Sequence, residues 1–384
     1  MARYLFASHD GFGLGHVRRN TLVARAILAR EPDAEIAVVT GLPMRPAWLG
    51  GQGVRVVPVP ALLKDSAGAY RNPGMSVQQA LAARSAAFRV AVDEVRPHVV
   101  VVDRHPYGTA GELRDGLHAA KRAGAALVLG LRDILDQSAA VEAELAGAGW
   151  AGVPELFDEV LVYGERILCD HEREYGLPVA PRYTGWVADC SGPRTREPGL
   201  VVVSAGGGGD GAQVFDLGAE LARRLPAGRF VVVAGPYATR DVTAAGNLTV
   251  LRDAPGCAEL FARATGVVQM AGYNTTFEAL AAGLRPVLVP RRNPRREQAI
   301  RASRLAALGV ADTVDEGVPA EEVDWLLGRD RLLPPGALAA AGIRLDGAER
   351  AAAAVLELAR ADRAPVGAAR TEEQVQGDTV GSAP

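Results

Sequence analysis

The stretch Ala271-Gly-Tyr-Asn-Thr-Thr-Phe-Glu-Ala-Leu-Ala-Ala-Gly-Leu-Arg-Pro-Val-Leu-Val-Pro290 decides the fold, because its residues predict a loop, a helix, a tight turn and a strand. A short apolar strand, Gly266–Met270, precedes it. Gly272 and Asn274-Thr275-Thr276 are residue types that open helices, since a small residue lets the backbone turn and an Asn or Thr oxygen caps N–H groups. Gly283 fits the position just after the helix. The order strand, helix, strand predicts a parallel α/β unit.

The start of this helix is a predicted anion site. A helix N-terminus at the end of a parallel strand attracts negative charge through its unpaired N–H groups and its dipole. Phosphate is therefore the first ligand to consider, with Gly272, Asn274 and Thr275 around it. Glu278 lies one turn further, where its carboxylate could accept hydrogen bonds from a pair of ligand hydroxyls such as a ribose diol. The alternative is an acid that only compensates the helix dipole.

Length and composition predict an ordinary two-domain globular protein. The chain has 384 residues, more than a single core usually holds. Hydrophobic residues make up 48% and charged residues 23% of it. The net charge of -3 argues against a nucleic-acid surface, which needs a basic field. A small phosphorylated ligand needs only local donors and stays possible.

Three cysteines, Cys169, Cys190 and Cys257, lie far apart and in no metal-ligand spacing, which predicts reduced thiols in a reducing compartment. The apolar run at the N-terminus is too short for a signal peptide, and no stretch reaches membrane-spanning length. We therefore expect a cytoplasmic protein, with a peripheral membrane contact left open. No metal-ligand motif stands at a plausible place, so we expect neither a metal nor a cofactor.

The chain contains the same pattern twice. A strand at Tyr4–Ser8 leads into the glycine-rich turn His9–His16 and a helix, and a strand at Leu200–Ser204 leads into the glycine turn Ala205–Gly211 and another helix. Strands that alternate with helices make a parallel sheet covered on both faces. Two such units facing each other predict a cleft lined by strand C-termini and helix N-termini.

The predicted boundaries divide the chain into a first domain, a linker, a second domain and a tail. They are residues 1–185, 186–198, 199–363 and 364–384, and the tail lacks apolar periodicity, as disordered segments do. We expect helices at 76–95, 111–122, 212–225, 257–264 and 349–361. The long stretch Ala61–Met75 predicts a lid or acceptor loop, or else a plain surface insertion.

The four glycines Gly206, Gly207, Gly208 and Gly209 follow a strand and precede a helix, so a phosphate or sugar could closely approach backbone N–H groups there. A nicotinamide site would instead need an acidic residue after the second strand of either unit. Thr40-Gly41 and Ala234-Gly235 occupy those places, which disfavours a dehydrogenase.

His16 is the candidate general base. It stands at the start of a helix that faces the predicted cleft, where the dipole favours the neutral imidazole. Asp103 and Asp133 follow parallel strands, where ligands of open sheets gather, and each carboxylate could be a base or could orient His16. The alternatives are a polar surface histidine and two local ion pairs.

A basic run, Arg291–Gln298, follows the strand after the opening helix. Its arginines could offset the charge of a diphosphate, and Glu297 and Gln298 could bond sugar hydroxyls. The alternative is a charged face that only meets water.

Four of these motifs resemble the GT-B glycosyltransferases, and most closely the peptidoglycan N-acetylglucosaminyltransferase family. They are Gly13-Leu-Gly-His16, the glycine run, Gly272–Pro286 and Arg296-Glu-Gln298. The stretch Ser8–His16 is also similar to bacterial predicted glycosyltransferases of unassigned substrate. The resemblance covers residues 3–361. It implies two Rossmann-like domains with parallel sheets facing across a cleft, the acceptor on the first and the nucleotide-sugar donor on the second.

The same resemblance implies a metal-independent, inverting transfer from a nucleoside-diphosphate sugar, such as UDP-N-acetylglucosamine, to an acceptor hydroxyl. The residues that match the family's site are Gly13, Gly15 and His16 in the first glycine loop, Gly206–Gly209 for the diphosphate, Leu251 and Arg252 for the base, Gly272, Asn274 and Thr275 at the helix start, Glu278 for the ribose, and Glu297 and Gln298 for the donor sugar.

Two departures from the family pattern limit what can be carried over. The family's Gln-Gln is Glu297-Gln298 here, which leaves the donor sugar open. Leu131-Arg-Asp-Ile134 stands where the cell-wall enzyme has His-Glu-Gln-Asn, so a lipid-linked muramoyl acceptor is not supported. A nucleotide-sugar 2-epimerase and a non-catalytic nucleotide-sugar-binding subunit remain the alternatives, and the acceptor, the base and the oligomeric state stay open.

Overall fold

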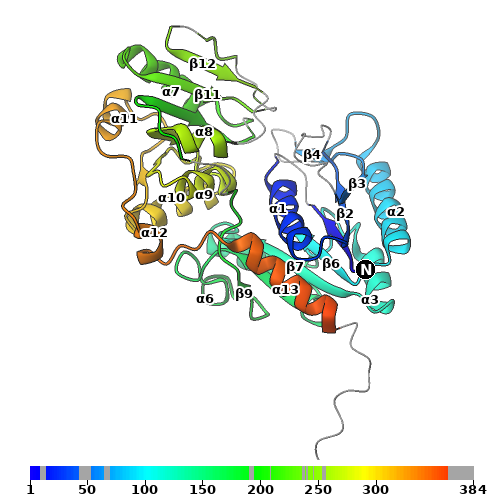
Figure 1. Cartoon of the computed structure of the whole chain (residues 1–384). Helices are drawn as coiled ribbons and strands as arrows, with labels where there is room; N and C mark the ends of the chain where they lie inside the picture. Colours follow the sequence, from blue (N-terminus) through cyan, green and yellow to red (C-terminus); the bar gives the residue numbers. More distant parts are fainter. Residues whose placement is uncertain are drawn as a thin grey trace, which may run out of the picture.

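The computed structural model describes residues 1–8, 14–42, 53–64, 70–189, 194–207, 209–235, 238, 241–244, 246–252 and 257–361, which form two α/β lobes (Figure 1). Gly13, Cys190, Gly208 and the tail from residue 362 onward lie outside the described residues. Both lobes have a parallel sheet with helices around it, so the predicted fold class is confirmed.

The sheet of the first lobe has seven strands within the described chain. Their bounds are β1 Arg3–Ala7, β2 Glu35–Thr40, β3 Val54–Pro58, β6 Val99–Asp103, β7 Ala126–Arg132, β8 Glu159–Tyr163 and β9 Arg182–Tyr183. Their order in space is β3-β2-β1-β6-β7-β8-β9, and every neighbouring pair is parallel. The predicted loop 61–75 holds a short antiparallel hairpin, β4 Leu63–Lys64 with β5 Tyr70–Arg71, and its residues 65–69 are not described.

The sheet of the second lobe has six strands within the described chain. They are β10 Leu200–Ser204, β11 Arg229–Val233, β12 Leu248–Leu251, β13 Gly266–Gln269, β14 Val287–Leu288 and β15 Asp312–Thr313. Their order is β12-β11-β10-β13-β14-β15, again with every pair parallel. The strands that precede the two predicted glycine turns, β1 and β10, both lie inside their sheets. Gly206 therefore lies just beyond the C-terminal end of β10, at the edge where ligands of open sheets bind.

Helices surround both sheets (Figure 1). The first lobe has α1 Gly15–Arg30, α2 Val77–Val95, α3 Arg114–Arg122, α4 Ser138–Leu145, α5 Val153–Leu156 and α6 His171–Tyr175. The chain continues with α7 Ala212–Arg224, α8 Ala258–Arg263, α9 Tyr273–Ala281, α10 Glu297–Ala307, α11 Ala320–Leu327, α12 Ala337–Ala340 and α13 Gly347–Ala361. The short helices α4, α5, α6, α11 and α12 were not predicted, since none has a long enough apolar period.

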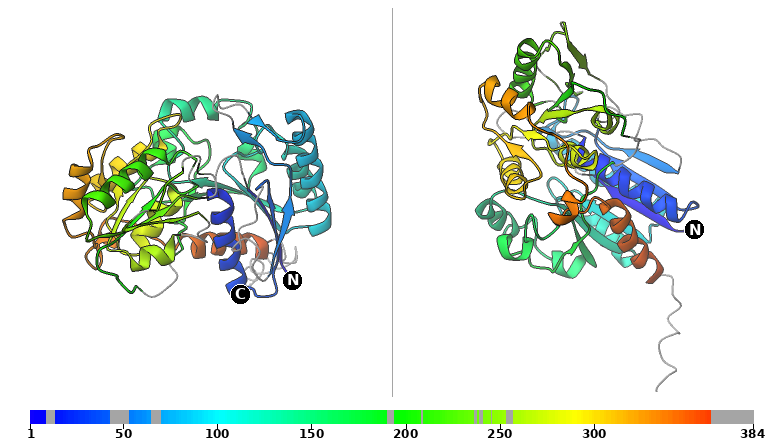
Figure 2. Two further views of the ribbon diagram at one scale, coloured as in Figure 1. Left: turned by 90° about the horizontal axis from the view of Figure 1, so that it is seen from above. Right: turned by 60° about the vertical axis from the view of Figure 1, so that its left-hand side comes forward.

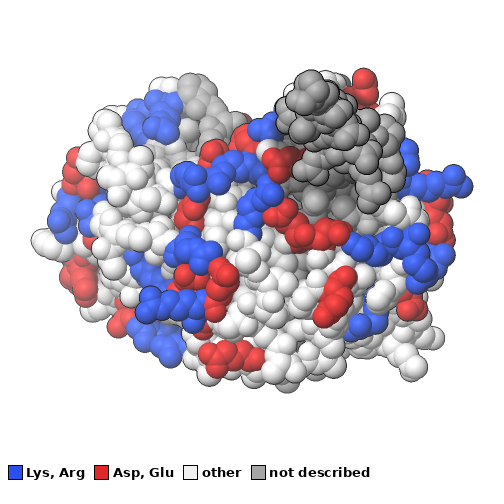
Figure 3. Space-filling view, turned by 90° about the horizontal axis from the view of Figure 1, so that it is seen from below, with Lys and Arg blue, Asp and Glu red and all other residues white. Residues whose placement is uncertain are grey.

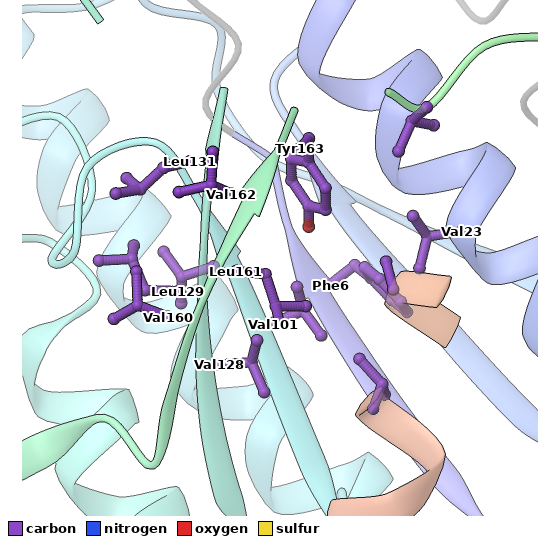
Figure 4. Close-up of a cluster of buried hydrophobic side chains, with 14 of the residues drawn as sticks. Phe6, Val23, Val101, Val128, Leu129, Leu131, Val160, Leu161, Val162 and Tyr163 are labelled. Atoms are coloured by element: carbon purple, nitrogen blue, oxygen red, sulfur yellow. The ribbon is translucent and has the colours of Figure 1, made fainter. Parts of the chain in front are cut away.

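The core of the first lobe lies between its sheet and α1 (Figure 4). Phe6, Val101 and Leu161 project from three strands, and Val23 meets them from α1; each is at most 1% exposed. A fully buried side chain of this kind contributes about 1.5–3 kcal/mol. The strands are apolar on both faces because helices cover both faces.

The last helix joins the two lobes. It was predicted as part of domain 199–363, but α13 packs against α1 and against β6, β7 and β8 of the first lobe (Figures 1 and 2). Where the chain crosses back, Trp186 N donates to Arg344 O at 2.8 Å and Gly347 N donates to Trp186 O at 3.1 Å. The chain thus passes between the lobes twice, near Trp186 and near Arg344. These two chain crossings pair through an antiparallel bridge between Val187 and Asp346. The predicted domain boundaries otherwise stay a prediction.

The start of α9 corrects one local prediction. Its N-cap is Gly272, in extended geometry and without a side-chain hydrogen bond, whereas the sequence predicted a cap from an Asn or Thr oxygen. Gly283 does follow the helix in the left-handed conformation, with φ of +77°. The N–H groups of the first turn are thus left without a side-chain partner, as an anion site requires.

The surface and the composition agree. On the face that Figure 3 shows, basic and acidic side chains lie beside each other, as the net charge of -3 suggests. Cys169 and Cys257 are buried free thiols. Within the described residues, no helix is both long and apolar enough to span a membrane.

Candidate functional site

The N-terminal turns of α1 and α9 meet between the lobes. Asn274 Nδ2 donates to Gly15 O at 3.2 Å, and a Cβ on Gly15 would lie 3.6 Å from the same nitrogen. Tyr273 strengthens the contact, because its hydroxyl donates to Tyr163 O at 2.9 Å. Residues from the first glycine loop and from the predicted phosphate helix are therefore brought together.

His16, Asp103 and Arg19 form a buried cluster on the first-lobe side of this contact. His16 Nδ1 lies 3.2 Å from Asp103 Oδ2, and the Asp103 side chain is completely buried. Arg19 Nη2 donates to both oxygens of Asp103, at 2.8 and 2.7 Å, and lies between the rings of Tyr163 and Tyr273. Arg19 Nη2 also lies 3.0 Å from His16 Nδ1. A proton on Nδ1 can be donated to Asp103, an obligate acceptor, and this tautomer leaves the lone pair on Nε2.

The electrostatics of this cluster keep the histidine neutral and the aspartate charged. Burial lowers the pKa of His16 to about 4, against the opposing pull of Asp103. Burial would raise the pKa of Asp103, but Arg19 and His16 together hold it at about 2. At neutral pH the imidazole is therefore in the form that can accept a proton, beside a fixed negative charge, and burial is the main cause, whereas the sequence argument used the helix dipole.

Glu278 lies in the second turn of α9 and is only 2% exposed. Its Oε1 accepts a hydrogen bond of 2.7 Å from Arg18 Nε of α1, and Arg18 Nη2 also lies 3.4 Å from Asp189 Oδ2. Burial raises the pKa of Glu278, although Arg18 opposes this. The predicted diol-binding carboxylate is thus bound to an arginine of the other lobe. Sequence analysis missed Arg18, since nothing local links residues 260 positions apart.

The second glycine loop faces the start of α9. Gly206 has φ of +64°, and a Cβ placed on it would lie 4.0 Å from Thr275 Cγ2. Gly235 allows the neighbouring strand end to approach this loop, because a Cβ there would lie 2.6 Å from Gly206 O and 2.7 Å from Gly207 O. The N-cap of the following helix α7 is Gly211, which has no side chain to cap the helix. Gly206 of the predicted diphosphate loop therefore lies beside the predicted phosphate helix.

Leu251 and Arg252, the segment predicted to bind the nucleobase of the donor, lie at the end of β12. Leu251 O accepts a hydrogen bond of 2.9 Å from Ala234 N, and the exposed Arg252 pairs with Asp241 at 2.6 Å. Residues 253–256, which follow, are outside the described chain. A role for Leu251 and Arg252 in binding a base stays a prediction.

Glu297 and Gln298 open α10 and are buried. Glu297 Oε1 accepts from Arg291 Nη2 at 3.0 Å and lies 3.9 Å from Arg132 Nη1, while its Oε2 is buried and has no hydrogen-bond partner among the described residues. Burial would raise the pKa of Glu297, but Arg132 and Arg291 hold it at about 2. A charged oxygen with an unused lone pair can accept a ligand hydroxyl.

Asp133, predicted as catalytic, forms a buried link between the lobes. Its carboxylate accepts two hydrogen bonds from Arg301 of α10, at 2.8 and 2.6 Å, one from Trp186 Nε1 at 3.1 Å and one from Ile134 N at 2.8 Å. Arg301, which sequence analysis missed, is 1% exposed. With four donors on two oxygens, Asp133 holds the lobes together, and the structure does not bring it into contact with His16.

The described residues contain no group of three or more His, Cys, Asp and Glu side chains arranged to hold a metal ion. Arginines and helix N-termini bring positive charge to this site.

Solved structures with the same architecture cover nearly the whole chain. The spinosyn forosaminyltransferase SpnP matches 94% of it and 99% of its own length, with a TM-score of 0.62 at 17% identity. A ugt transferase from Siraitia grosvenorii in complex with UDP matches 94% of this chain and 96% of its own, with a TM-score of 0.55 at 14% identity. MurG of Acinetobacter baumannii matches 94% and 98%, with a TM-score of 0.50 at 16% identity.

No protein-family model and no curated protein matches the sequence. At the identities of the structural matches it is the fold that is shared, and it is the GT-B fold of glycosyltransferases. The resemblance expected from the sequence motifs is confirmed at this level.

Proposed function

We propose that the protein is a glycosyltransferase that moves a sugar from a nucleoside diphosphate to an acceptor hydroxyl. The donor is a UDP-sugar such as UDP-N-acetylglucosamine, and the transfer is metal-independent and inverting. The observation that carries the proposal is the contact between α1 and α9, which brings the neutral His16 and its Asp103 to the start of the predicted phosphate helix. The shared fold with a transferase complexed with UDP also supports it.

The reaction follows from these groups. His16 Nε2 takes the proton of the acceptor hydroxyl while that oxygen bonds to the anomeric carbon, and the bond from this carbon to the diphosphate breaks on the opposite side. Asp103 stabilises the resulting imidazolium. The diphosphate leaves with the electron pair of the broken bond and so gains a negative charge. The N–H groups of α9, the glycine loop and Arg291 would stabilise this charge. The buried Glu297 Oε2 would accept a hydroxyl of the donor sugar.

The donor's ribose must exchange with Arg18. Because Arg18 Nε occupies Glu278 Oε1, diol binding requires that this ion pair breaks or that the lobes tilt apart. Arg18 would then turn its guanidinium from Glu278 toward the diphosphate. This exchange makes donor binding depend on both lobes, not on the second lobe alone.

Glu278→Gln is expected to weaken UDP binding about 10- to 100-fold and to remove any preference for UDP over 2′-deoxy-UDP. The reason is that hydrogen bonds to a charged acceptor contribute about 1.5–3 kcal/mol, and the amide is a weaker acceptor. Thermal shifts over a titration of each nucleotide measure both effects, since stabilisation grows with ligand over Kd. Glu259→Gln, at an exposed position of α8, is the matched control. Equal titrations for wild type and Glu278→Gln would remove the ribose assignment.

The pH profile of kcat/KM is expected to rise through an apparent pKa of about 4, not through the ordinary histidine value of 6.5. His16 must be neutral to accept a proton, and its lowered pKa keeps it neutral above about pH 4. Activity at pH 5.5 should therefore nearly equal that at pH 7. Initial rates of UDP release at low substrate concentration, measured between about pH 3 and pH 8, give the midpoint of this acidic limb. A rising limb centred at 6.5 or above would contradict the buried-base mechanism.

Product analysis separates the proposal from its alternatives. A transferase releases UDP and forms a glycosylated acceptor in equal amounts. Free epimerised sugar in the absence of an acceptor would identify an epimerase, and donor binding without any single-turnover release of UDP would identify a non-catalytic subunit.

A further inference from the structure

Arg132, at the end of β7, carries a positive charge that the protein only partly neutralises. Its side chain is 17% exposed, Nη2 donates to Leu135 O at 2.9 Å, and Nη1 lies 3.9 Å from Glu297 Oε1. Its Nε is buried and has no hydrogen-bond partner in the described chain. Glu297 already binds Arg291 at 3.0 Å, so Arg132 has only a distant share of one carboxylate.

Arg295 brings a second cation to the same place from the other lobe. The two residues after it are anchored there, because Arg296 N donates to Asp136 Oδ1 at 2.9 Å and Glu297 faces Arg132. The side chain of Arg295 is half-buried and makes no hydrogen bond or ion pair with any residue that the structure describes. Its charge nevertheless reaches both His105 and Arg132, and it acts to lower their pKa values.

The neighbouring arginines differ from these two because each has its own carboxylate. Arg104 makes two hydrogen bonds of 3.0 Å to Glu144, and Arg301 makes two to Asp133. Burial and the charges of Arg104, Arg301 and Arg295 lower the pKa of Arg132 to about 10. A partly buried guanidinium without a full counter-charge is costly, and an anionic ligand removes the cost.

We propose that Arg132 and Arg295 bind an anionic group of the acceptor, so that the acceptor of this enzyme carries a carboxylate or a phosphate. The assignment to the acceptor rests on the proposed function, in which the donor's diphosphate takes the glycine loop and α9. Arg132 belongs to the first lobe, and Arg295 acts on His105, which lines a cavity of about 440 Å³ in that lobe. Tyr107 and Trp150 give this cavity an aromatic wall, which suits the body of an acceptor.

The first test uses inorganic phosphate as the probe. With saturating UDP and constant ionic strength, phosphate is expected to raise the melting temperature of wild type, and Arg295→Gln and Arg132→Gln should each weaken its binding about tenfold. Arg292→Gln is the matched control, because Arg292 lies in the same loop but is exposed and pairs with Asp315. If Arg132→Gln folds poorly, Arg295→Gln alone decides, since that side chain holds no other residue.

The outcomes distinguish this inference from the proposed function. Equal phosphate shifts in wild type, Arg292→Gln and Arg295→Gln would overturn the anion site. UDP titrations without phosphate should give the same melting-temperature shifts in all variants. If UDP does not stabilise wild type, the proposed function is wrong. The phosphate titrations without UDP then still test the anion site at the two arginines.

The second test addresses the acceptor directly. Hydroxylated carboxylic acids, hydroxylated phosphate monoesters and the neutral methyl esters of the acids are compared in a UDP-release assay. The anionic members are expected to react at least tenfold better by kcat/KM in wild type and to lose this advantage in Arg295→Gln. A preference for carboxylates over phosphates, or the reverse, identifies the source of the anion. Equal rates for acids and esters in wild type would overturn the proposal.

Discussion

Replacement of His16 by alanine is expected to reduce sugar transfer about 10²- to 10⁴-fold while UDP binding stays within about twofold of wild type. His16 is the group placed to take the acceptor proton, because burial keeps it neutral and Asp103 orients it and stabilises its charged form. Its removal deletes the proton acceptor but leaves Glu278 and the glycine loop in place. Rates of UDP release with acceptor, together with a thermal titration of UDP, measure the two quantities.

His118→Ala is the control for His16, since His118 lies on an exposed position of α3. Asp103→Asn provides a second readout. It removes the charge that raises the pKa of His16, so the acidic limb of the pH profile should move to lower pH while the rate falls. A His16→Ala enzyme with wild-type kcat would show that another group takes the proton.

Asp133→Ala is expected to lower the free energy of unfolding by about 3–5 kcal/mol, the largest loss that we anticipate for a single substitution in this chain. The change removes two of the three hydrogen bonds of the Arg301 guanidinium, which is 1% exposed, and also the acceptor of Trp186 Nε1. The midpoint of urea unfolding, followed by tryptophan fluorescence, measures the effect.

Two comparisons test the cause. Asp93→Ala breaks a surface pair with Arg89 in which both side chains are about half exposed, and it should move the midpoint little. The double change Asp133→Leu with Arg301→Met removes both charges at once and should recover most of the loss. A mild effect of Asp133→Ala on stability with a severe loss of kcat would instead support the catalytic role predicted from the sequence.

Much of the fold could be predicted because parallel strands and strong helices have local signals. The apolar runs at β1, β10 and β13 and the helix expected at 76–95 match their predicted positions within two residues. Short helices such as α5 and α6 could not be predicted, because a single turn is stabilised by its tertiary contacts and not by its own pattern.

The candidate site was predictable only as single residues. His16 and Asp103 come together because His16 follows the C-terminal end of β1 and Asp103 is the last residue of its neighbour β6. Parallel strands put these ends at the same edge of the sheet, so the sequence could suggest that the two residues lie close. The partners of Glu278 and Asp133 could not be found this way. Arg18 and Arg301 lie 260 and 168 residues from them, and only the packing of one lobe on the other joins each pair.

The paired chain crossings at Trp186 and Arg344 restrict how this protein can open. Because the two chain segments that connect the lobes are hydrogen-bonded to each other, we expect any relative motion of the lobes to be a rotation about this line. Arg18 and Glu278 lie close to this line, because Arg18 Nη2 is 3.4 Å from Asp189 Oδ2 and Trp186 stacks on Phe277. We therefore expect substrates to enter and leave the cleft on the side that lies farther from this line. The substrate that binds closer to the line would have to bind first.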